Sequence, residues 1–559
     1  MAKQNVFGID LGTTYSCIAY VDDSGKPVAL PNVEGQYTTP SVVLFEDESR
    51  TVGKEAKNSA VLYSDRVVEM VKRQMGNASW RFDYQGREYT PEEISSYILR
   101  KVVQDASTAL NGQPINDVVI TCPAYFGIAQ RQATQRAGEI AGLNVLEVIN
   151  EPTAAAISYN LLQEQSKQVV LVYDLGGGTF DITMIEIDGG AVTVISTGGN
   201  PELGGRDWDL AIINYLADEW KNKTGSYDDP TLDTETMQDL WQKAENAKIS
   251  LSGRPSVQVA VQHAGQREGI TLTREQFDEL TASLLERTVQ YTKETLATAR
   301  TKGVSRFDHL LLVGGSSKMP QVKERLTKEF NIEPKLFDPD QSVAKGAAIH
   351  GQMLSIGTQV RINIGREMGI DPDKVDMDNI PTQLIDRVQQ TVANDSGLSL
   401  GFVKKAGDSE VVNVVSHSFG MISVDTNTRP YTDVISNLVK AGDKLPKTGI
   451  SVTKTFRTLE QDQERIDLQI MENTSTADVY RDINSAIEIG TGVINLPPRL
   501  PEGAPVEVTF DLNSSGLLHV IAREIKSGRQ GEVTVQTAEG LTQQEVKEIT
   551  ERSAKLTIS

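Results

Sequence analysis

The chain has 559 residues, which is too long for one hydrophobic core, so we expect roughly two to four domains. Its formal net charge of −21 argues against non-specific binding to nucleic acid or to anionic membranes. With only Cys17 and Cys122, the chain cannot form a disulfide framework or a zinc cluster, and both cysteines lie in apolar runs typical of buried side chains. The N-terminus has no signal-peptide pattern and no apolar run spans a bilayer, so the expected location is the cytoplasm.

Short apolar runs alternate with helical stretches over the first 350 or so residues. Residues 117–126 indicate a buried strand, and a polar helix follows from about Ala129 to Ala141. Residues 272–302 indicate a long helix, and 307–317 a buried strand that runs into glycines and then into the helix at 322–330. Near-continuous apolar strands flanked by helices predict a covered, mainly parallel sheet.

Two carboxylates flank a glycine triplet in the stretch VVLVYDLGGGTFDITMIEI, residues 169–187. A plain hairpin needs one or two glycines and has no use for Asp174 and Asp181 on either side of them. Glycines at 176–178 let backbone N–H groups approach an anion, and the carboxylates would repel that anion unless a cation lay between them. The motif therefore favours phosphate with Mg²⁺ bound largely through water, and the alternative is a glycine-rich turn with solvated acids.

A repeat strengthens this interpretation. FGIDLGTTYS at 7–16 resembles VYDLGGGTFD at 172–181, and a third glycine turn at 314–316 ends another strand. Two similar phosphate turns that face each other would clamp a nucleotide from both sides.

The second part of the chain has a different pattern. Residues 354–408 hold a polar, loop-like first half, which we interpret as an atypical insertion or connector. From about Val411 short alternating strands and turn signals predict an antiparallel β-sandwich. A single helix is expected at 541–556, with Thr542 as N-cap and Glu545 completing a capping box.

Four motifs, GIDLGTTYS, INEPTAAAISY, DLGGGTFD and LLLVGGSSKMP, together resemble the 70-kDa heat-shock chaperone family, the DnaK-like proteins. The resemblance implies an actin-like, two-lobed α/β ATPase domain at 1–353 and a β-sandwich peptide-binding domain at 411–537. It leaves 354–410 as an atypical insertion or linker and 538–559 as the start of a truncated lid helix.

The resemblance also assigns a nucleotide site with ATP or ADP and Mg²⁺ as cofactors and K⁺ as a further candidate cation. Its implied catalytic residues are Asp10, Lys72, Glu151, Asp174 and Thr179, and the implied metal ligands, acting through water, are Asp10, Asp174 and Asp181. The implied nucleotide-binding residues are Gly12, Thr13, Thr14, Tyr15, Gly176, Gly177, Gly178, Glu245, Lys248, Ser252, Gly314, Gly315, Ser316, Lys318 and Asp340. Such a set suits phosphoryl transfer, which depends on positioning and charge neutralisation.

Two of these implied residues have simpler interpretations. Lys72 without the motif would be a solvated helix lysine, and Glu151 an acid at a helix start beside Pro152. The chain also departs from the family at the base, with Ile249 and Lys318 where arginines are usual. Because a lost guanidinium stack costs roughly 0.5–2 kcal/mol, we expect weaker nucleotide binding and faster exchange.

The resemblance implies a peptide site in the sandwich. Met421, Phe456, Ile466 and Leu468 would line a slot for one apolar side chain, with Val424 and Leu459 arching over an extended peptide. The alternative for Ile470, on the same strand, is plain core. The partners would be unfolded or extended polypeptides, a J-domain co-chaperone and a nucleotide-exchange factor.

Coupling between the two sites is the least secure part of the resemblance. Pro123 and Arg131 match residues of the family's interdomain relay, but SEVVN at 409–413 places Asn413 where the family linker has aspartate. The family lid extends far beyond the single helix expected here, so peptide should leave fast in every nucleotide state if the chain ends naturally at 559. The leading interpretation is an ATP-driven chaperone. The alternatives are a regulatory or scaffolding relative with weak ATPase and a dedicated partner, and a small-molecule kinase on the same fold.

Overall fold

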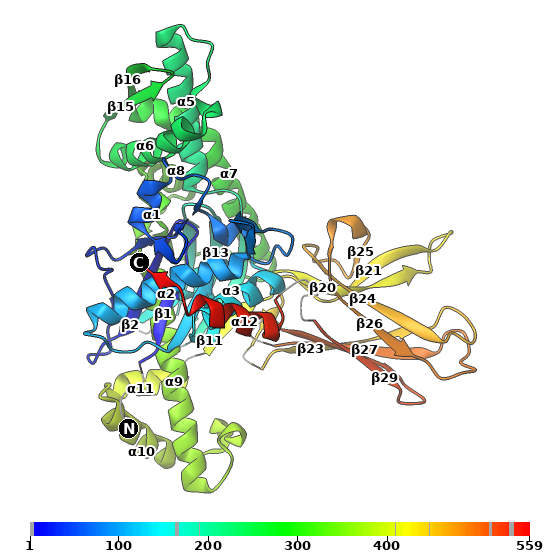
Figure 1. Cartoon of the computed structure of the whole chain (residues 1–559). Coiled ribbons are helices and arrows are strands. Elements are labelled where there is room, and N and C mark those ends of the chain that lie inside the picture. The colour runs from blue at the N-terminus through cyan, green and yellow to red at the C-terminus, as the bar shows by residue number, and fades with distance from the viewer. Residues whose placement is uncertain are drawn as a thin grey trace.

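The computed structural model describes residues 5–161, 167–188, 191–408, 410–446, 448–513, 517–535 and 541–559. In these ranges no helix is long and apolar enough to cross a membrane. A body of helices and sheets is built mainly from the first 408 residues, and a region of β-strands extends from one side of it (Figure 1).

The first sheet of the body contains the first of the two repeated turns. Its strand order is β11 (Asn144–Asn150), β10 (Asp117–Cys122), β1 (Phe7–Asp10), β2 (Tyr15–Val21) and β3 (Pro27–Ala29), with β4 (Thr39–Pro40) also paired to β2. β11, β10 and β1 are parallel, whereas β1, β2 and β3 form an antiparallel meander.

The second sheet repeats this topology around the second turn. Its order is β18 (Lys335–Leu336), β17 (His309–Val313), β12 (Gln168–Leu175), β13 (Phe180–Asp188), β14 (Ala191–Asn200), β19 (Glu410–Val414) and β22 (Lys444–Leu445). β18, β17 and β12 are parallel, and β12, β13 and β14 are antiparallel. The expectation of mainly parallel sheets is therefore wrong, because each repeated glycine turn is short enough to join only antiparallel neighbours.

Two helices pack together between the sheets, α4 (Glu151–Leu161) and α9 (Ser342–Met368). Their contact is close enough that a Cβ on Gly346 would lie 1.7 Å from the carbonyl oxygen of Ala154. The remaining helices of the body are α1 (Lys54–Ser59), η1 (Val71–Gln74), α2 (Pro91–Ala109), α3 (Ile128–Ile140), α5 (Gly205–Thr224), η2 (Pro230–Leu232), α6 (Thr234–Gly253), α7 (Arg274–Thr301), η3 (Gly315–Lys318) and α8 (Pro320–Phe330). Short strands complete it: β5 (Val43–Phe45), β6 (Ser49–Val52), β7 (Val67–Val68), β8 (Phe82–Tyr84), β9 (Arg87–Tyr89), β15 (Ser256–His263) and β16 (Gln266–Thr273). The helices predicted near 129–141, 272–302 and 322–330 are confirmed as α3, α7 and α8.

The segment at 354–408 is largely helical, which corrects its interpretation as a loop-like connector. α9 continues to Met368, and two short 3₁₀ helices, η4 (Pro372–Lys374) and η5 (Met377–Asn379), lead to α10 (Thr382–Ser396) and α11 (Leu400–Asp408). Val360 and Ile364 on α9, and Val388 and Val392 on α10, are buried at helical spacing in the same core as α4. Because the first half of segment 354–408 is rich in polar residues, the sequence did not indicate this apolar helical face.

The β region, residues 418–535 apart from β22, consists of two antiparallel sheets that share one core, as the alternating pattern predicts. One contains β25 (Val479–Tyr480), β21 (Thr432–Val439), β20 (Ser418–Asp425), β24 (Arg465–Asn473) and β26 (Ile487–Asn495), with η6 (Ile483–Ser485) beside it. The other contains β23 (Ile450–Arg457), β27 (Pro505–Leu512), β28 (Leu518–Glu524) and β29 (Gln530–Val535).

The C-terminal segment, residues 541–559, returns to the body. Thr542 caps α12 (Gln543–Ser553) and exchanges hydrogen bonds with Glu545, which confirms the capping box. α12 packs on α3, and β30 (Thr557–Ile558) pairs with β6 (Figure 1). The expected boundary at 538 lies outside the described residues.

Candidate functional site

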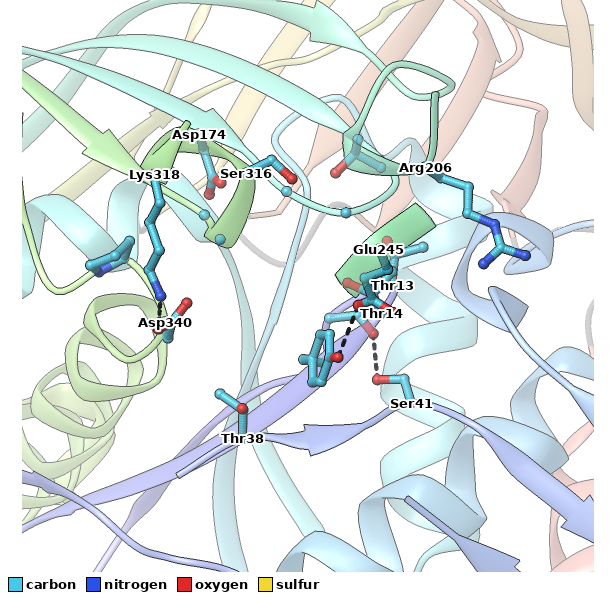
Figure 2. A pocket seen from close by; sticks show the side chains of 18 of the residues that line it. Thr13, Thr14, Thr38, Ser41, Asp174, Arg206, Glu245, Ser316, Lys318 and Asp340 are labelled. Atoms are coloured by element: carbon cyan, nitrogen blue, oxygen red, sulfur yellow. Dashed lines mark hydrogen bonds and ion pairs between the residues drawn. The ribbon is translucent and has the colours of Figure 1, made fainter. Parts of the chain in front are cut away.

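A cavity of about 500 Å³ lies between the two halves of the body, one built around the first sheet and the other around the second. It opens where β1, β12 and β17 end. Figure 2 shows side chains from both halves around it. The sequence-predicted residues that line it are Asp10, Gly12, Thr13, Thr14, Tyr15, Lys72, Glu151, Asp174, Gly176, Gly177, Thr179, Glu245, Lys248, Ser252, Gly314, Gly315, Ser316, Lys318 and Asp340. Gly178 packs against Thr13, and Asp181 is only 1% exposed behind the wall.

The two repeated turns face each other, as the repeat predicts. A Cβ on Gly177 would lie 2.3 Å from Thr14 Oγ1, and a Cβ on Gly178 would lie 2.6 Å from Thr13 Cγ2. None of the three glycines at 176–178 has a positive φ, so glycine is needed there for the close approach of the two turns. Gly314 differs, since its φ is +79° and a Cβ would lie 2.4 Å from Asp174 Oδ1.

The three predicted metal ligands are crowded, with Asp174 and Asp181 buried and Asp10 partly buried. Asp174 and Asp181 are paired positions across the β12–β13 hairpin, and Asp10 ends β1. Burial and the Glu151 carboxylate raise the pKa of Asp10 to about 7, and burial with neighbouring carboxylates raises the pKa values of Asp174 and Asp181 well above their usual range. A cation would relieve this repulsion, so hard oxygen ligands and unfavourable charge both fit Mg²⁺. Among the described residues no three acidic, histidine or cysteine side chains converge to hold an ion by themselves.

Lys72 is the cation inside this acidic cluster. It lies on η1, is 5% exposed, and its Nζ lies 2.5 Å from Glu151 Oε1. Burial opposes its charge, but the carboxylates of Glu151 and Asp10 outweigh it and raise the pKa of Lys72. The interpretation of Lys72 as a solvated lysine is therefore wrong. Glu151 does begin α4, as its simpler interpretation holds, but it is also buried and paired.

The other end of the cavity holds the residues predicted for adenosine. Glu245 Oε2 accepts from Lys57 Nζ at 2.5 Å, and Tyr15 donates to the same carboxylate at 3.0 Å. Lys248 Nζ lies 2.7 Å from Asp209 and donates to the Gly205 carbonyl at 2.8 Å.

At the position predicted to contact the adenine base, Ile249 lines the cavity and is 61% exposed. Lys318 forms an ion pair with Asp340 across from it. Neither Ile249 nor Lys318 supplies a guanidinium at the two positions where the sequence analysis expects one to stack on the adenine.

Sequence reasoning missed part of the wall. The unpredicted lining residues are Thr38, Ser41, Val42, Lys57, Glu69, Met70, Arg206, Asp209, Val313, Met319, Pro339 and Val343. Ser41 orders the first turn by donating from Oγ to the Gly12 carbonyl and from its backbone N–H to the Thr14 carbonyl, both at 2.8 Å. Val313 and Met319 lie within the LLLVGGSSKMP motif, whereas the others come from segments without phosphate motifs, where the glycine pair before Arg206 was one available signal.

The strand β19 connects the body to the β region. It pairs in parallel with β14, where Val411 lies opposite Val192, and antiparallel with β22, where Asn413 lies opposite Leu445. The Thr153 hydroxyl, two residues after Glu151, donates to the Asn413 side chain at 3.3 Å. The predicted linker is therefore an inner strand of the second sheet.

Pro123 and Arg131 lie between the cavity and the β region. Pro123 precedes Ala124, whose N–H donates to Asp181 Oδ1 at 3.1 Å. Arg131 donates to the Phe126 carbonyl at 3.2 Å and to the Asn150 side chain. The Phe126 carbonyl also accepts from Ser416 Oγ at 3.3 Å, so contacts run from Asp181 to the start of the β region.

The interface also contains two ionisable groups, the buried Glu472 and the partly buried His417. A Cβ on Gly127 would lie 2.3 Å from Glu472 Oε1, and His417 Nδ1 lies 3.1 Å from the same oxygen without hydrogen-bond alignment. Burial raises the pKa of Glu472 to about 7 and, together with Arg131, lowers that of His417 to about 4. Lys302 adds a contact by donating to the Gly442 carbonyl at 2.7 Å.

The predicted peptide residues lie within the β region. Met421 and Leu468 are buried in its core, and Phe456 and Ile466 are partly buried against them. Val424 is half-buried on β20, and Leu459, just after β23, is 42% exposed. Ile470 is fully buried, as its core interpretation requires.

Comparisons with known proteins agree with this arrangement. The model of the family described as Hsp70 protein matches residues 6–81, 78–364 and 414–558. The matched ranges leave out 365–413, which include α10 and α11. The chaperone protein DnaK of Thermosipho melanesiensis is 34% identical over 562 residues, covering 99% of this chain and 84% of that protein.

Proposed function

Because the chain belongs to the Hsp70 family, we propose that it binds extended apolar segments of unfolded polypeptides and that ATP controls their release. Family membership makes it an ATP-binding chaperone; the proposal adds the site residues, the domain roles and the coupling. In it, residues 1–353 form the actin-like ATPase domain, 411–537 the peptide-binding domain, 354–410 a helical insertion, and 538–559 a segment held on the ATPase domain. A cytoplasmic location stays a prediction.

The facing turns support the proposed nucleotide site. Bound ATP would supply the phosphoryl group, and Mg²⁺ the positive charge that the ionised carboxylates of Asp10, Asp174 and Asp181 lack. Backbone N–H groups and hydroxyls of the two turns would hold the phosphates, and Lys72, fixed by Glu151, would neutralise charge at the transferred group. Slow hydrolysis is part of the proposal.

The observation that carries the coupling is the position of β19. One strand is paired with β14 of the ATPase domain and with β22 beside the β region, and Thr153 links it to the helix that Glu151 begins. A change around Glu151 therefore has a short physical route to the peptide-binding domain. J-domain and nucleotide-exchange partners remain part of the proposal through the family.

This function is tested by the release of a labelled, unstructured, leucine-rich peptide. Fluorescence anisotropy measures the release without nucleotide, with Mg-ADP and with Mg-ATP. A peptide of equal length with serine in place of leucine is the matched control. We expect the leucine peptide to bind and to leave faster with ATP than with ADP. Binding that no nucleotide changes would refute the coupling, and no binding would refute the peptide site.

A regulatory or scaffolding role with weak ATPase is the second candidate, and two observations favour it. Ile249 removes a base-stacking partner, and the segment after the β region is bound to β6 and α3. If the leucine peptide does not bind while ADP does, this candidate replaces the first.

A further inference from the structure

Arg206 stands where the two halves of the body meet at the phosphate end of the cavity. It is the second residue of α5, and that helix begins against the second glycine turn. The Arg206 N–H donates to the Gly177 carbonyl at 2.8 Å, and the Gly205 N–H donates to the Gly176 carbonyl at 2.9 Å. The backbone of Arg206 therefore moves with the turn proposed to hold phosphate.

The Arg206 side chain is oriented by an aromatic ring from the same half. Its guanidinium carbon lies 3.5 Å from the centroid of the Trp241 ring on α6. A stacked guanidinium keeps its N–H groups in the plane, where they can reach a carboxylate. Trp241 thus fixes the direction in which Arg206 donates.

That direction crosses the cleft. Arg206 Nη2 lies 3.3 Å from Glu69 Oε2, which follows β7 in the other half and precedes Lys72 by three residues. The side chains are 26% and 20% exposed, so the pair is partly shielded from water, and both residues line the cavity, as Figure 2 shows for Arg206.

A second ion pair crosses the same cleft farther along α6. Lys57 on α1 meets Glu245, one helical turn after Trp241, and Gln242 donates to the Lys57 carbonyl at 2.8 Å. The two halves are thus joined at two places that lie one helical turn apart along α6. Opening the cleft must break both ion pairs.

We propose that Arg206, held by Trp241 and paired with Glu69, is a positioning residue that keeps the cleft closed over the phosphates and so sets the rate of nucleotide release. The proposal rests on the proposed nucleotide site. Lys72 is held separately by Glu151, so loss of Arg206 should change the rate of nucleotide release more than the rate of the hydrolytic step.

Release of a fluorescent ADP from the full chain, with single-turnover hydrolysis of bound ATP, tests the proposal. Arg206→Ala should speed release by about fivefold to twentyfold, and Arg206→Lys by less, because lysine keeps the charge and loses the stack. Glu69→Ala should act like Arg206→Ala, and the double variant should not exceed either. Arg325→Ala is the matched control, since its partners Glu286 and Glu329 lie in its own half.

A second measurement does not depend on nucleotide. Spin labels on Leu62→Cys and Leu232→Cys, which are 72% and 86% exposed in opposite halves, report cleft width, while the native Cys17 and Cys122 are buried. We expect a longer and broader distance distribution in Arg206→Ala than in the unaltered chain. Unchanged distances, or release effects of the two single variants that multiply, would overturn the proposed Arg206–Glu69 clasp. Failure of the unaltered chain to bind ADP would instead overturn the proposed function, and the distances would still decide the clasp.

Discussion

An ion pair between a partly exposed arginine and a buried acid connects the C-terminal segment to the body, and Arg552→Ala tests how strongly. Arg552 on α12 donates to both carboxylate oxygens of Glu93 on α2, and Glu93 is fully buried. Arg100 adds hydrogen bonds to the Ser553 and Leu556 carbonyls. Removing Arg552 leaves a buried carboxylate without its main cationic partner.

The cost follows from the burial of the two partners. Breaking a fully buried pair costs about 3–5 kcal/mol. Arg552 is 38% exposed and the Tyr97 hydroxyl still donates to Glu93 at 2.9 Å, so we expect about 1.5–3 kcal/mol. The C-terminal segment should then open roughly 10- to 150-fold more often.

Hydrogen exchange followed by mass spectrometry measures this opening. The informative amides are those of α12 and of Val52, which donates to the Ser559 carbonyl at 2.9 Å. Lys547→Ala removes an exposed cation from the same helix and is the control. If α12 exchanges equally fast in both variants, the Glu93 pair does not hold the segment and the reasoning from burial fails.

Other perturbations test the two proposed sites. Asp174→Asn should lower ATP turnover by about 10²–10³-fold while the unfolding temperature of the nucleotide-free protein stays equal or rises, since a repelled buried charge is removed. Lys72→Ala should lower ATP turnover. It should also lower the free energy of unfolding in urea by about 3 kcal/mol, because the buried Glu151 carboxylate loses its cationic partner. Phe456→Ala should weaken binding of the leucine peptide and cost only about 1–2 kcal/mol, since the ring is partly buried. Docking of the β region on the body should strengthen as pH falls from 8 to 6.5. Hydrogen exchange of the β19 amides measures this docking. The pKa of Glu472 is raised to about 7 when docked, so docking weakens as pH rises toward and through 7 and the carboxyl ionises; Glu472→Gln should remove this trend. The lowered pKa of the neighbouring His417 acts in the opposite sense and weakens docking again at more acidic pH.

The sequence predicted what short-range patterns control. Each glycine turn, the β-sandwich alternation and the Thr542 capping box depend on residues within a few positions of one another, and each is present; that the two turns face each other was inferred from their repeat. The parallel-sheet expectation failed because apolar runs alone do not report strand direction, which the short glycine turns decide.

Short-range sequence patterns could not predict the contacts between segments that are distant along the chain. Lys57 and Arg206 enter the cleft wall from helices without phosphate motifs, and their partners Glu245 and Glu69 lie 188 and 137 positions away. The docking of α12 on α3 likewise depends on Glu93, a buried acid that looks like an ordinary helix-start residue in the sequence. Only the fold brings these residues together.

The β region is fastened to the body at both ends. At the C-terminal end, buried Ile558, the β30–β6 pairing and the Arg552–Glu93 ion pair act together. At the N-terminal end, β19 is held to β14 by three paired positions, 191–193, beside the Thr153–Asn413 and Ser416–Phe126 hydrogen bonds. Because Thr153 is two residues from Glu151, a signal from the nucleotide site would reach β19 before α12, and the β region would stay tethered nearby at high effective concentration and redock quickly. ATP control in this chain would then act through the β19 contacts near Thr153, with the C-terminal segment as a fixed support.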